Sequence, residues 1–190
     1  MTIEIISGSP RSGSLTHRVA LFLQQYLKEV TDHNIGLLDV REHNLPPVQN
    51  VFSSVDNTPE EYKETTRRMF AADAFILVTP EYNGSYSPAL KNLLDHYPKQ
   101  VHKPFGIVTA SPGAMGGIRA AIQLQQLIFA LFGIGSPYML VVPGVDKKFD
   151  ESGKLLDESF TLSIENFVTE YLWLAEKLVT EKAVKQKIAA

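Results

Sequence analysis

Short apolar runs alternate along the chain with longer stretches in which apolar residues recur every three or four positions. The short runs predict strands at residues 3–6, 35–40, 74–79, 105–110 and 138–142. The longer stretches predict helices at residues 15–30, from 58 to about 72, from 87, at 118–132 and from 160 onward. Because strands and helices alternate five times, we expect an α/β fold, a three-layer sandwich in which helices cover both faces of a five-stranded parallel sheet.

Helical spacing also assigns individual side chains to the core or to the surface. Phe129 and Phe132 are expected in the core, because they end the most apolar helical stretch. Arg67 and Arg68 are expected on a solvated helix face. Trp173 lies off the main apolar stripe of the last helix, so we expect it at the edge of the core, with a subunit contact as the alternative.

The composition is that of an ordinary globular domain, with 44% hydrophobic and 21% charged residues. We expect a single domain over residues 1–190. The net charge of −3 offers no basic excess for nucleic acid. The absence of cysteine excludes disulfides, thiol nucleophiles and cysteine-bound metals, and the five histidines show no metal-binding spacing.

The sequence contains neither a secretion signal nor a membrane-spanning segment that we can recognise. The first residues lack the basic segment and apolar core of a signal peptide. The longest apolar run, residues 127–132, is too short to cross a bilayer. We therefore expect a cytoplasmic protein with no membrane partner.

Three strand-to-helix loops carry an unusual density of glycine, serine and aromatic residues: 7–16, 79–88 and 109–119. In open parallel sheets, ligands bind at the carboxyl ends of the strands, near the point where the strand order reverses. In the order 2-1-3-4-5, the strands that precede these loops are neighbours, so we expect the loops to form one pocket.

The first loop, SGSPRSGSLT, opens a helix and carries Arg11. A helix N-terminus offers free N–H groups and a positive dipole end, and arginine adds a fork that matches phosphate oxygens. Ser14-Leu15 stands where a nucleoside-triphosphate loop needs Lys-Ser/Thr, and the dinucleotide pattern GxGxxG is absent. The loop therefore predicts a phosphate site of another kind, with an ordinary capped turn as the alternative.

The second and third loops have features that suit a flat aromatic ligand. Asn83-Gly84 predicts a tight turn flanked by Tyr82 and Tyr86, whose rings either stack on a ligand or pack on their neighbours. The third loop holds three glycines in five residues, which permits close approach of the backbone to a ligand. A merely flexible loop is the alternative for that segment.

With these loops, GSPRSGSLT, PEYNGSYSPALKNLLDH and SPGAMGGIRA, the chain resembles the NADPH-dependent FMN reductase family of flavodoxin-like proteins, over roughly residues 1–180. That family includes azo-, quinone- and chromate-reducing members. The resemblance implies a flavodoxin-like fold and an FMN site made by the three loops. The cofactor-binding residues that it implies are Ser9, Arg11, Ser14, Leu15 and Thr16; Pro80, Glu81, Tyr82, Asn83 and Gly84; and Ser111, Gly113, Gly116 and Gly117.

The resemblance further implies an FMN-dependent oxidoreductase in which NADPH passes hydride to bound FMN. A flavin, quinone, azo compound or similar small molecule would then accept the electrons in a ping-pong cycle. No side chain is expected to act as a catalytic acid or nucleophile, because the cofactor carries the electrons. Family members also imply a homodimer or homotetramer. The alternative is a flavodoxin-type electron carrier or a non-catalytic flavin-binding protein.

Overall fold

The structure is a computed structural model that describes residues 1–189, with side chains up to residue 180. The last residue of the expected domain, Ala190, lies outside the described residues. Six parallel strands form one sheet: β1 (Thr2–Ser7), β2 (Asn34–Asp39), β3 (Ala74–Thr79), β4 (Pro104–Ser111), β5 (Ile134–Gly135) and β6 (Leu140–Pro143). Their order, β2-β1-β3-β4-β5, confirms the predicted topology.

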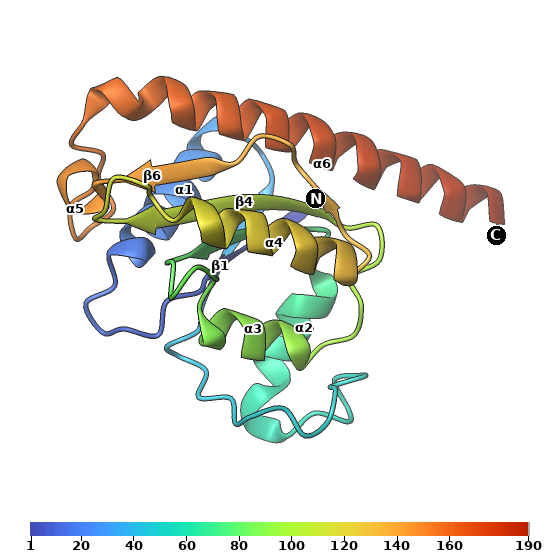
Figure 1. Ribbon diagram of the computed structural model, residues 1–190. Coiled ribbons are helices and arrows are strands. Elements are labelled where there is room, and N and C mark those ends of the chain that lie inside the picture. The colour runs from blue at the N-terminus through green and yellow to red at the C-terminus, as the bar shows by residue number, and fades with distance from the viewer. Residues whose placement is uncertain (190) are drawn as a thin grey trace.

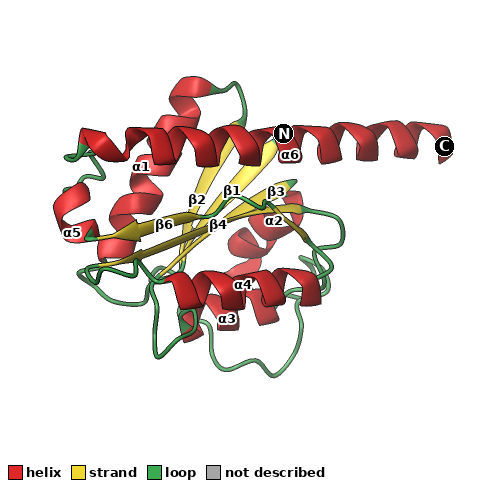
Figure 2. Ribbon diagram, turned by 45° about the horizontal axis from the view of Figure 1, so that its top comes forward, coloured by secondary structure: helices red, strands yellow, loops and turns green. Residues whose placement is uncertain are grey.

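Helices cover both faces of this sheet (Figures 1 and 2). The helices are α1 (Leu15–Val30), α2 (Lys63–Ala71), α3 (Pro88–Asp95), α4 (Ile118–Ala130), α5 (Val145–Lys148) and α6 (Thr161–Ala189), with short 3₁₀ turns at Glu60–Tyr62 and Glu158–Phe160. One core cluster joins the sheet to α1 and α6, and the other joins it to α2, α3 and α4. Within residues 1–189, no helix is long and apolar enough to cross a membrane.

The central strand β3 is buried along its whole length and serves both cores. Ile76 and Val78 face α1 and α6, whereas Phe75 and Leu77 face the opposite helices. This alternation follows from the period of two in a strand, and burial on both faces explains why β3 reads as a continuous apolar run.

The fifth strand position is divided between two short strands, which corrects the single strand expected at 138–142. β5 and β6 both pair with β4, at its beginning and at its end. Between them, the Ser136 N–H donates to the carbonyl of Phe105 at 2.8 Å, and Pro137 follows. Since proline has no N–H to donate, the ladder is interrupted there.

Three aromatic residues assigned to the core or its edge are on the surface instead. Phe129 is 76% exposed, Phe132 is 62% exposed and Trp173 is 59% exposed. Helix α4 buries the stripe that includes Leu124 and Ile128, so Phe129 falls on its outer face. The helix ends at Ala130, and Phe132 adopts a left-handed φ of 57° as the chain turns away.

Arg68 was expected on a solvated face but pairs with a buried carboxylate. Glu4 of β1 has only 3% of its side chain exposed, and Arg68 of α2 reaches it through both Nη2 and Nε, the latter at 3.2 Å. Gly36, beside Glu4 in the neighbouring strand, leaves room for the carboxylate, because a Cβ there would lie 2.5 Å from it. Burial raises the pKa of Glu4, although Arg68 opposes the shift.

We predict that Arg68→Ala lowers the free energy of unfolding by about 3–5 kcal/mol, since it strands a buried carboxylate. The neighbouring Arg67→Ala is the matched control, because Arg67 forms an exposed pair with Glu64 and its loss should cost less than about 1 kcal/mol. Urea unfolding measures both variants. Equal effects would show that the Glu4–Arg68 pair does not stabilise the fold.

Candidate functional site

The three glycine- and serine-rich loops leave neighbouring strands at the same edge of the sheet. β1 and β3 are in register to Ser7 and Val78, and β3 and β4 to Thr79 and Thr109. The Gly8 N–H continues the ladder by donating to the carbonyl of Val78 at 2.8 Å. The carboxyl ends of β1, β3 and β4 therefore place the loops side by side.

Ser87 joins the second loop to the first beneath the surface. Its hydroxyl donates to the carbonyl of Gly8 and accepts the N–H of Leu90 at 3.1 Å, which caps α3. Its own N–H donates to the hydroxyl of Thr79 at 3.1 Å, across the base of the loop. Because Ser87 is fully buried, water does not compete for these bonds.

The tip of the second loop is the tight turn that the Asn-Gly pair predicts. Tyr82 and Ser85 exchange backbone hydrogen bonds of 2.8 and 3.0 Å, while Asn83 and Gly84 adopt positive φ values of 50° and 84°. These values are typical of a type I′ turn, which asparagine and glycine favour. No hydrogen bond within the described residues uses the N–H groups of Asn83 and Gly84, so both donors are free at the tip of the loop.

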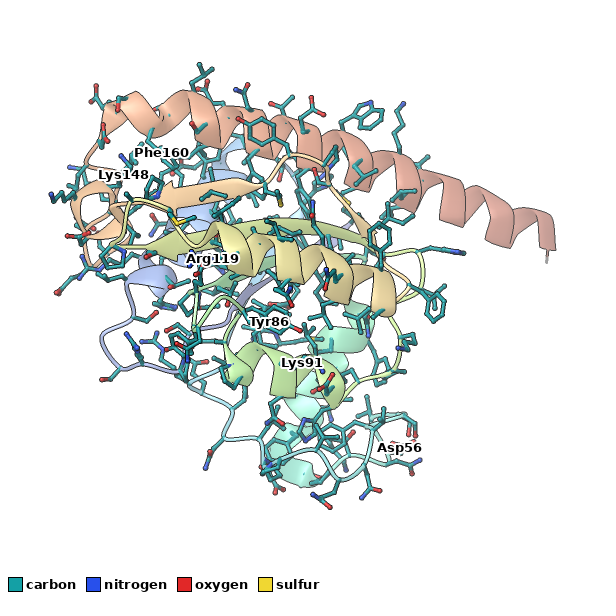
Figure 3. The ribbon with its side chains drawn as sticks, viewed as in Figure 1. Asp56, Tyr86, Lys91, Arg119, Lys148 and Phe160 are labelled. Atoms are coloured by element: carbon teal, nitrogen blue, oxygen red, sulfur yellow. The ribbon has the colours of Figure 1, made fainter. Side chains whose placement is uncertain are left out.

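The two tyrosines of this loop have different environments. Tyr86 packs against the core beside α3, and burial raises the pKa of its phenol (Figure 3). Tyr82 lies under the first loop, with its ring centroid 4.9 Å from the guanidinium carbon of Arg11. The packing alternative therefore describes Tyr86, whereas Tyr82 links the first and second loops.

At Gly116 and Gly117 the third loop passes so close to its neighbours that a larger residue would crowd them. A Cβ on Gly116 would lie 2.7 Å from Val141, and one on Gly117 would lie 3.0 Å from the Cβ of Thr109. Both glycines have positive φ values, 58° and 89°. Gly113 and Ser111 sit farther out, where the Gly113 N–H donates to the Ser111 hydroxyl at 3.0 Å.

The carboxylate of Glu81 points to α4. Glu81 was expected to line a ligand ring, but its oxygens accept the N–H of Arg119 at 3.2 Å and the Arg119 guanidinium at 3.4 Å. Figure 3 shows Arg119 at the beginning of α4. Glu81 thus joins the second and third loops, as Ser87 joins the first and second.

The first loop presents unused donors around the beginning of α1. Ser14 caps the helix by accepting the His17 N–H at 3.1 Å. Ser9, Ser14 and Thr16 are buried, whereas Arg11 is exposed. Within residues 1–189, the N–H groups from Arg11 to Gly13 have no hydrogen-bond partner. A helix N-terminus with free donors and a nearby cation is suited to an anion.

Comparisons with known proteins agree with this geometry. The family model described as NADPH-dependent FMN reductase matches residues 1–145. An FMN-dependent NADPH-azoreductase from Staphylococcus saprophyticus is 32% identical over 179 residues, covering 88% of this chain and 92% of that protein. The chain belongs to the NADPH-dependent FMN reductase family. The expected enzyme class and the cofactor pair, FMN and NADPH, are therefore confirmed at the level of the family.

Solved structures share the fold with this FMN reductase family member. FerB, a flavoenzyme NAD(P)H:(acceptor) oxidoreductase from Paracoccus denitrificans, is similar with a TM-score of 0.78 at 23% identity, covering 93% of this chain and 97% of its own. A flavodoxin variant from Pseudomonas aeruginosa has a TM-score of 0.53 at 21% identity, with 94% and 97% covered. The flavodoxin-like fold expected from the loops is thus confirmed.

The residues present in this reductase fit FMN. The first loop has the free N–H groups and the cation that a phosphate needs, and the Asn83-Gly84 turn has free N–H groups for the polar edge of a flavin. The Tyr82 hydroxyl is buried and has no partner among the described residues, which is a costly arrangement unless a ligand satisfies it. The roles of the individual cofactor-binding residues stay predictions.

Sequence reasoning missed a polar network behind the first loop. Arg41 donates to both oxygens of Asp39, with Nε at 3.0 and 2.9 Å, and through Nη1 to the carbonyl of Ser12 at 3.0 Å. His17 Nδ1 lies 3.1 Å from Asp39 and 2.9 Å from the hydroxyl of Ser7. We call Asp39, Arg41 and His17 the brace of the first loop. The position of Asp39 and Arg41 at the end of the strand beside β1 is the feature that could have revealed it.

The contacts among Ser7, His17 and Asp39 are not those of a hydrolytic triad. Ser7 and Asp39 approach the same imidazole nitrogen, whereas a triad uses one nitrogen for each partner. Burial lowers the pKa of His17, although Asp39 opposes the shift. For Asp39, burial raises the pKa, but the hydrogen bonds and charges of Arg41 and His17 outweigh it, so the pKa is lowered overall.

Two cavities lie on either side of the brace. One, of about 650 Å³, lies between residues 40–47 and α3 and reaches Pro10 of the first loop. Lys91, labelled in Figure 3, lines it and pairs with Asp95. The other, of about 260 Å³, lies between Ser12 and Glu151. The third loop, residues 109–119, lines neither of these two cavities.

We predict that acid destabilises the fold through His17. Its folded-state pKa is lowered, so the unfolded chain binds a proton more readily below the ordinary histidine pKa of about 6.5. The stability is therefore fully present above that pH and is lost as the pH falls. Urea unfolding between about pH 7.5 and about pH 5.5 should show a smaller loss in His17→Gln than in the wild type.

His102→Asn is the control for this comparison, because His102 lies outside the network and its left-handed φ of 60° suits asparagine. It should lose as much stability as the wild type over the same range. Equal losses in all three proteins would contradict a role for His17.

Proposed function

We propose that this protein is an FMN-dependent NADPH oxidoreductase that passes electrons to a small acceptor in a ping-pong cycle. The observation that carries the proposal is the convergence of three loops. The first two have free backbone N–H groups and the third has a glycine-lined backbone, which suits a phosphate at one end and a flat ring at the other. Bound FMN supplies the redox chemistry, because it accepts hydride from NADPH and donates electrons onward.

The protein's own residues bind and orient in this scheme. Ser9, Arg11, Ser14 and Thr16 hold the phosphate, with Leu15 alongside, and Arg41 supports their loop from behind through the Ser12 carbonyl. The N–H groups of the Asn83-Gly84 turn and of the glycine-rich loop stabilise negative charge that develops on the ring.

Azo compounds are the acceptor class to test before quinones and free flavin. The Staphylococcus saprophyticus relative and one from Staphylococcus aureus, also 32% identical, are both named FMN-dependent NADPH-azoreductase. NADPH and the acceptor would occupy the same place in turn, which is what a ping-pong cycle requires. We also propose that residues 1–190 are one domain and that the protein is cytoplasmic.

We further propose that the protein is a homodimer or homotetramer whose contact includes the outer face of α4. Ile122 and Phe129 lie seven residues apart on that face, and both are exposed. Exposed apolar residues clustered on one helix face are typical of subunit contacts.

Light scattering should give an oligomer for the wild type and a smaller species for Phe129→Ser. A monomeric wild type would contradict the proposal.

Steady-state kinetics test the function. With NADPH and an azo dye varied together, double-reciprocal plots should give parallel lines, because one product leaves before the second substrate binds. Intersecting lines would contradict the ping-pong cycle. Binding of FMN without NADPH oxidation by any acceptor would favour an electron carrier instead.

We predict that Arg11→Ala weakens FMN binding by about 1.5–3 kcal/mol, the range for hydrogen bonds to charged groups. Arg11→Lys keeps the charge but loses the planar fork, so its affinity should fall between those of the wild type and Arg11→Ala. Titration of the apoprotein with FMN, followed by flavin fluorescence, measures all three. Unchanged affinity in Arg11→Ala would remove Arg11 from the phosphate site.

A further inference from the structure

Helix α4 lacks an N-cap of its own. The cap position is Gly117, which has no side chain, and the first turn contains no acidic residue. A helix with neither feature leaves free N–H groups and an uncompensated positive dipole end. In this chain, one of these N–H groups, that of Arg119, donates a hydrogen bond to Glu81 of the second loop, 38 residues earlier in the sequence.

The contact is bidentate and partly shielded from water. One carboxylate oxygen of Glu81 accepts the Arg119 N–H at 3.2 Å, and the other faces the Arg119 guanidinium at 3.4 Å. Only 17% of the Glu81 side chain is exposed. The two backbones are also close, since a Cβ on Gly117 would lie 3.6 Å from the Cβ of Glu81.

The same contact reaches the tip of the second loop. The Cδ atom of Arg119 would lie 3.8 Å from a Cβ on Gly84, so Arg119 extends from α4 along the turn that presents the free N–H groups. Glu81 therefore influences the site in two ways. It fixes the spacing of the two loops, and it places a negative charge at the positive end of α4, next to the proposed ring site.

We propose that Glu81 is a positioning residue that clamps the glycine-rich loop to the Tyr82–Ser85 turn and, through its charge, lowers the midpoint potential of bound FMN. The effect of the charge on the midpoint potential rests on the proposed function, whereas the clamp between the two loops does not require FMN. Neutral glutamine can still accept the Arg119 N–H, so Glu81→Gln removes the charge and keeps the clamp. Glu81→Ala removes both.

Two variants and a control separate these effects. In the apoprotein, exchange of the Arg119 amide hydrogen, followed by NMR, should be about fivefold faster in Glu81→Ala, which removes the acceptor that caps the helix, and near the wild-type rate in Glu81→Gln, which keeps an acceptor. The dissociation constant for FMN should follow the same order. Glu64→Gln is the matched control, because Glu64 is an exposed glutamate on α2 that pairs with Arg67.

The midpoint potential distinguishes the charge from the clamp. It should shift to a more positive value in Glu81→Gln and in Glu81→Ala, and stay at the wild-type value in Glu64→Gln. A wild-type potential in Glu81→Gln would overturn the charge part, and unchanged amide exchange in Glu81→Ala would overturn the clamp. If Glu81→Ala does not fold, faster exchange in Glu81→Asp, whose side chain is one methylene shorter, replaces it as the test of the clamp.

A wild-type protein that binds no FMN overturns the function and the charge part together, while amide exchange in the apoprotein still decides the clamp.

Discussion

The buried hydroxyl of Ser87 holds the arrangement of the candidate site together. It bonds to the carbonyl of Gly8 on one side and caps α3 on the other, so the first loop, the second loop and a helix meet at one atom. The sheet order makes this possible, because β1 and β3 are neighbours and their ends are in register. Glu81 repeats the connection between the second and third loops. The second loop therefore contacts both of the other loops. A binding surface made from three separate segments needs such contacts if it is to have its final shape before a ligand arrives.

Periodicity predicted a parallel sheet with helices on both faces, since the central strands are apolar and the helices that cover them have buried stripes. It failed where an apolar residue is not in the core. The outer face of α4 also carries the apolar residues Ile122 and Phe129, so apolar character alone could not tell that Phe129 points outward. Periodicity also misplaced Arg68, a charged residue that was expected to face solvent. Its partner Glu4 lies 64 residues away on a buried strand, so the local pattern gave no sign of the pair. Pro137 was visible in the sequence, but only the run after it was interpreted as a strand, and the short strand Ile134–Gly135 before it was missed.

The sequence predicted which loops form the candidate site, but not the side-chain contacts that join those loops. Strand ends, glycine spacing and the Asn83-Gly84 pair indicated where a ligand would lie, because these features act locally. Arg41 contacts Ser12 across 29 residues of sequence, and Glu81 contacts Arg119 across 38 residues, so the patterns within the loops do not indicate these contacts. Only the position of Asp39 and Arg41 at the end of the strand beside β1 could have pointed to the first of them. Glu81 shows the limit most clearly. Its place in the loop is that of a ring-lining residue, but its carboxylate faces α4.

The central claim is that the three loops form a flavin site at which NADPH delivers electrons. The most direct test is the visible absorbance spectrum of the FMN-loaded protein without oxygen, recorded before and after one equivalent of NADPH. We predict prompt loss of the absorbance band of oxidised flavin. A protein that binds no flavin, or a bound flavin whose spectrum NADPH leaves unchanged, would contradict the claim.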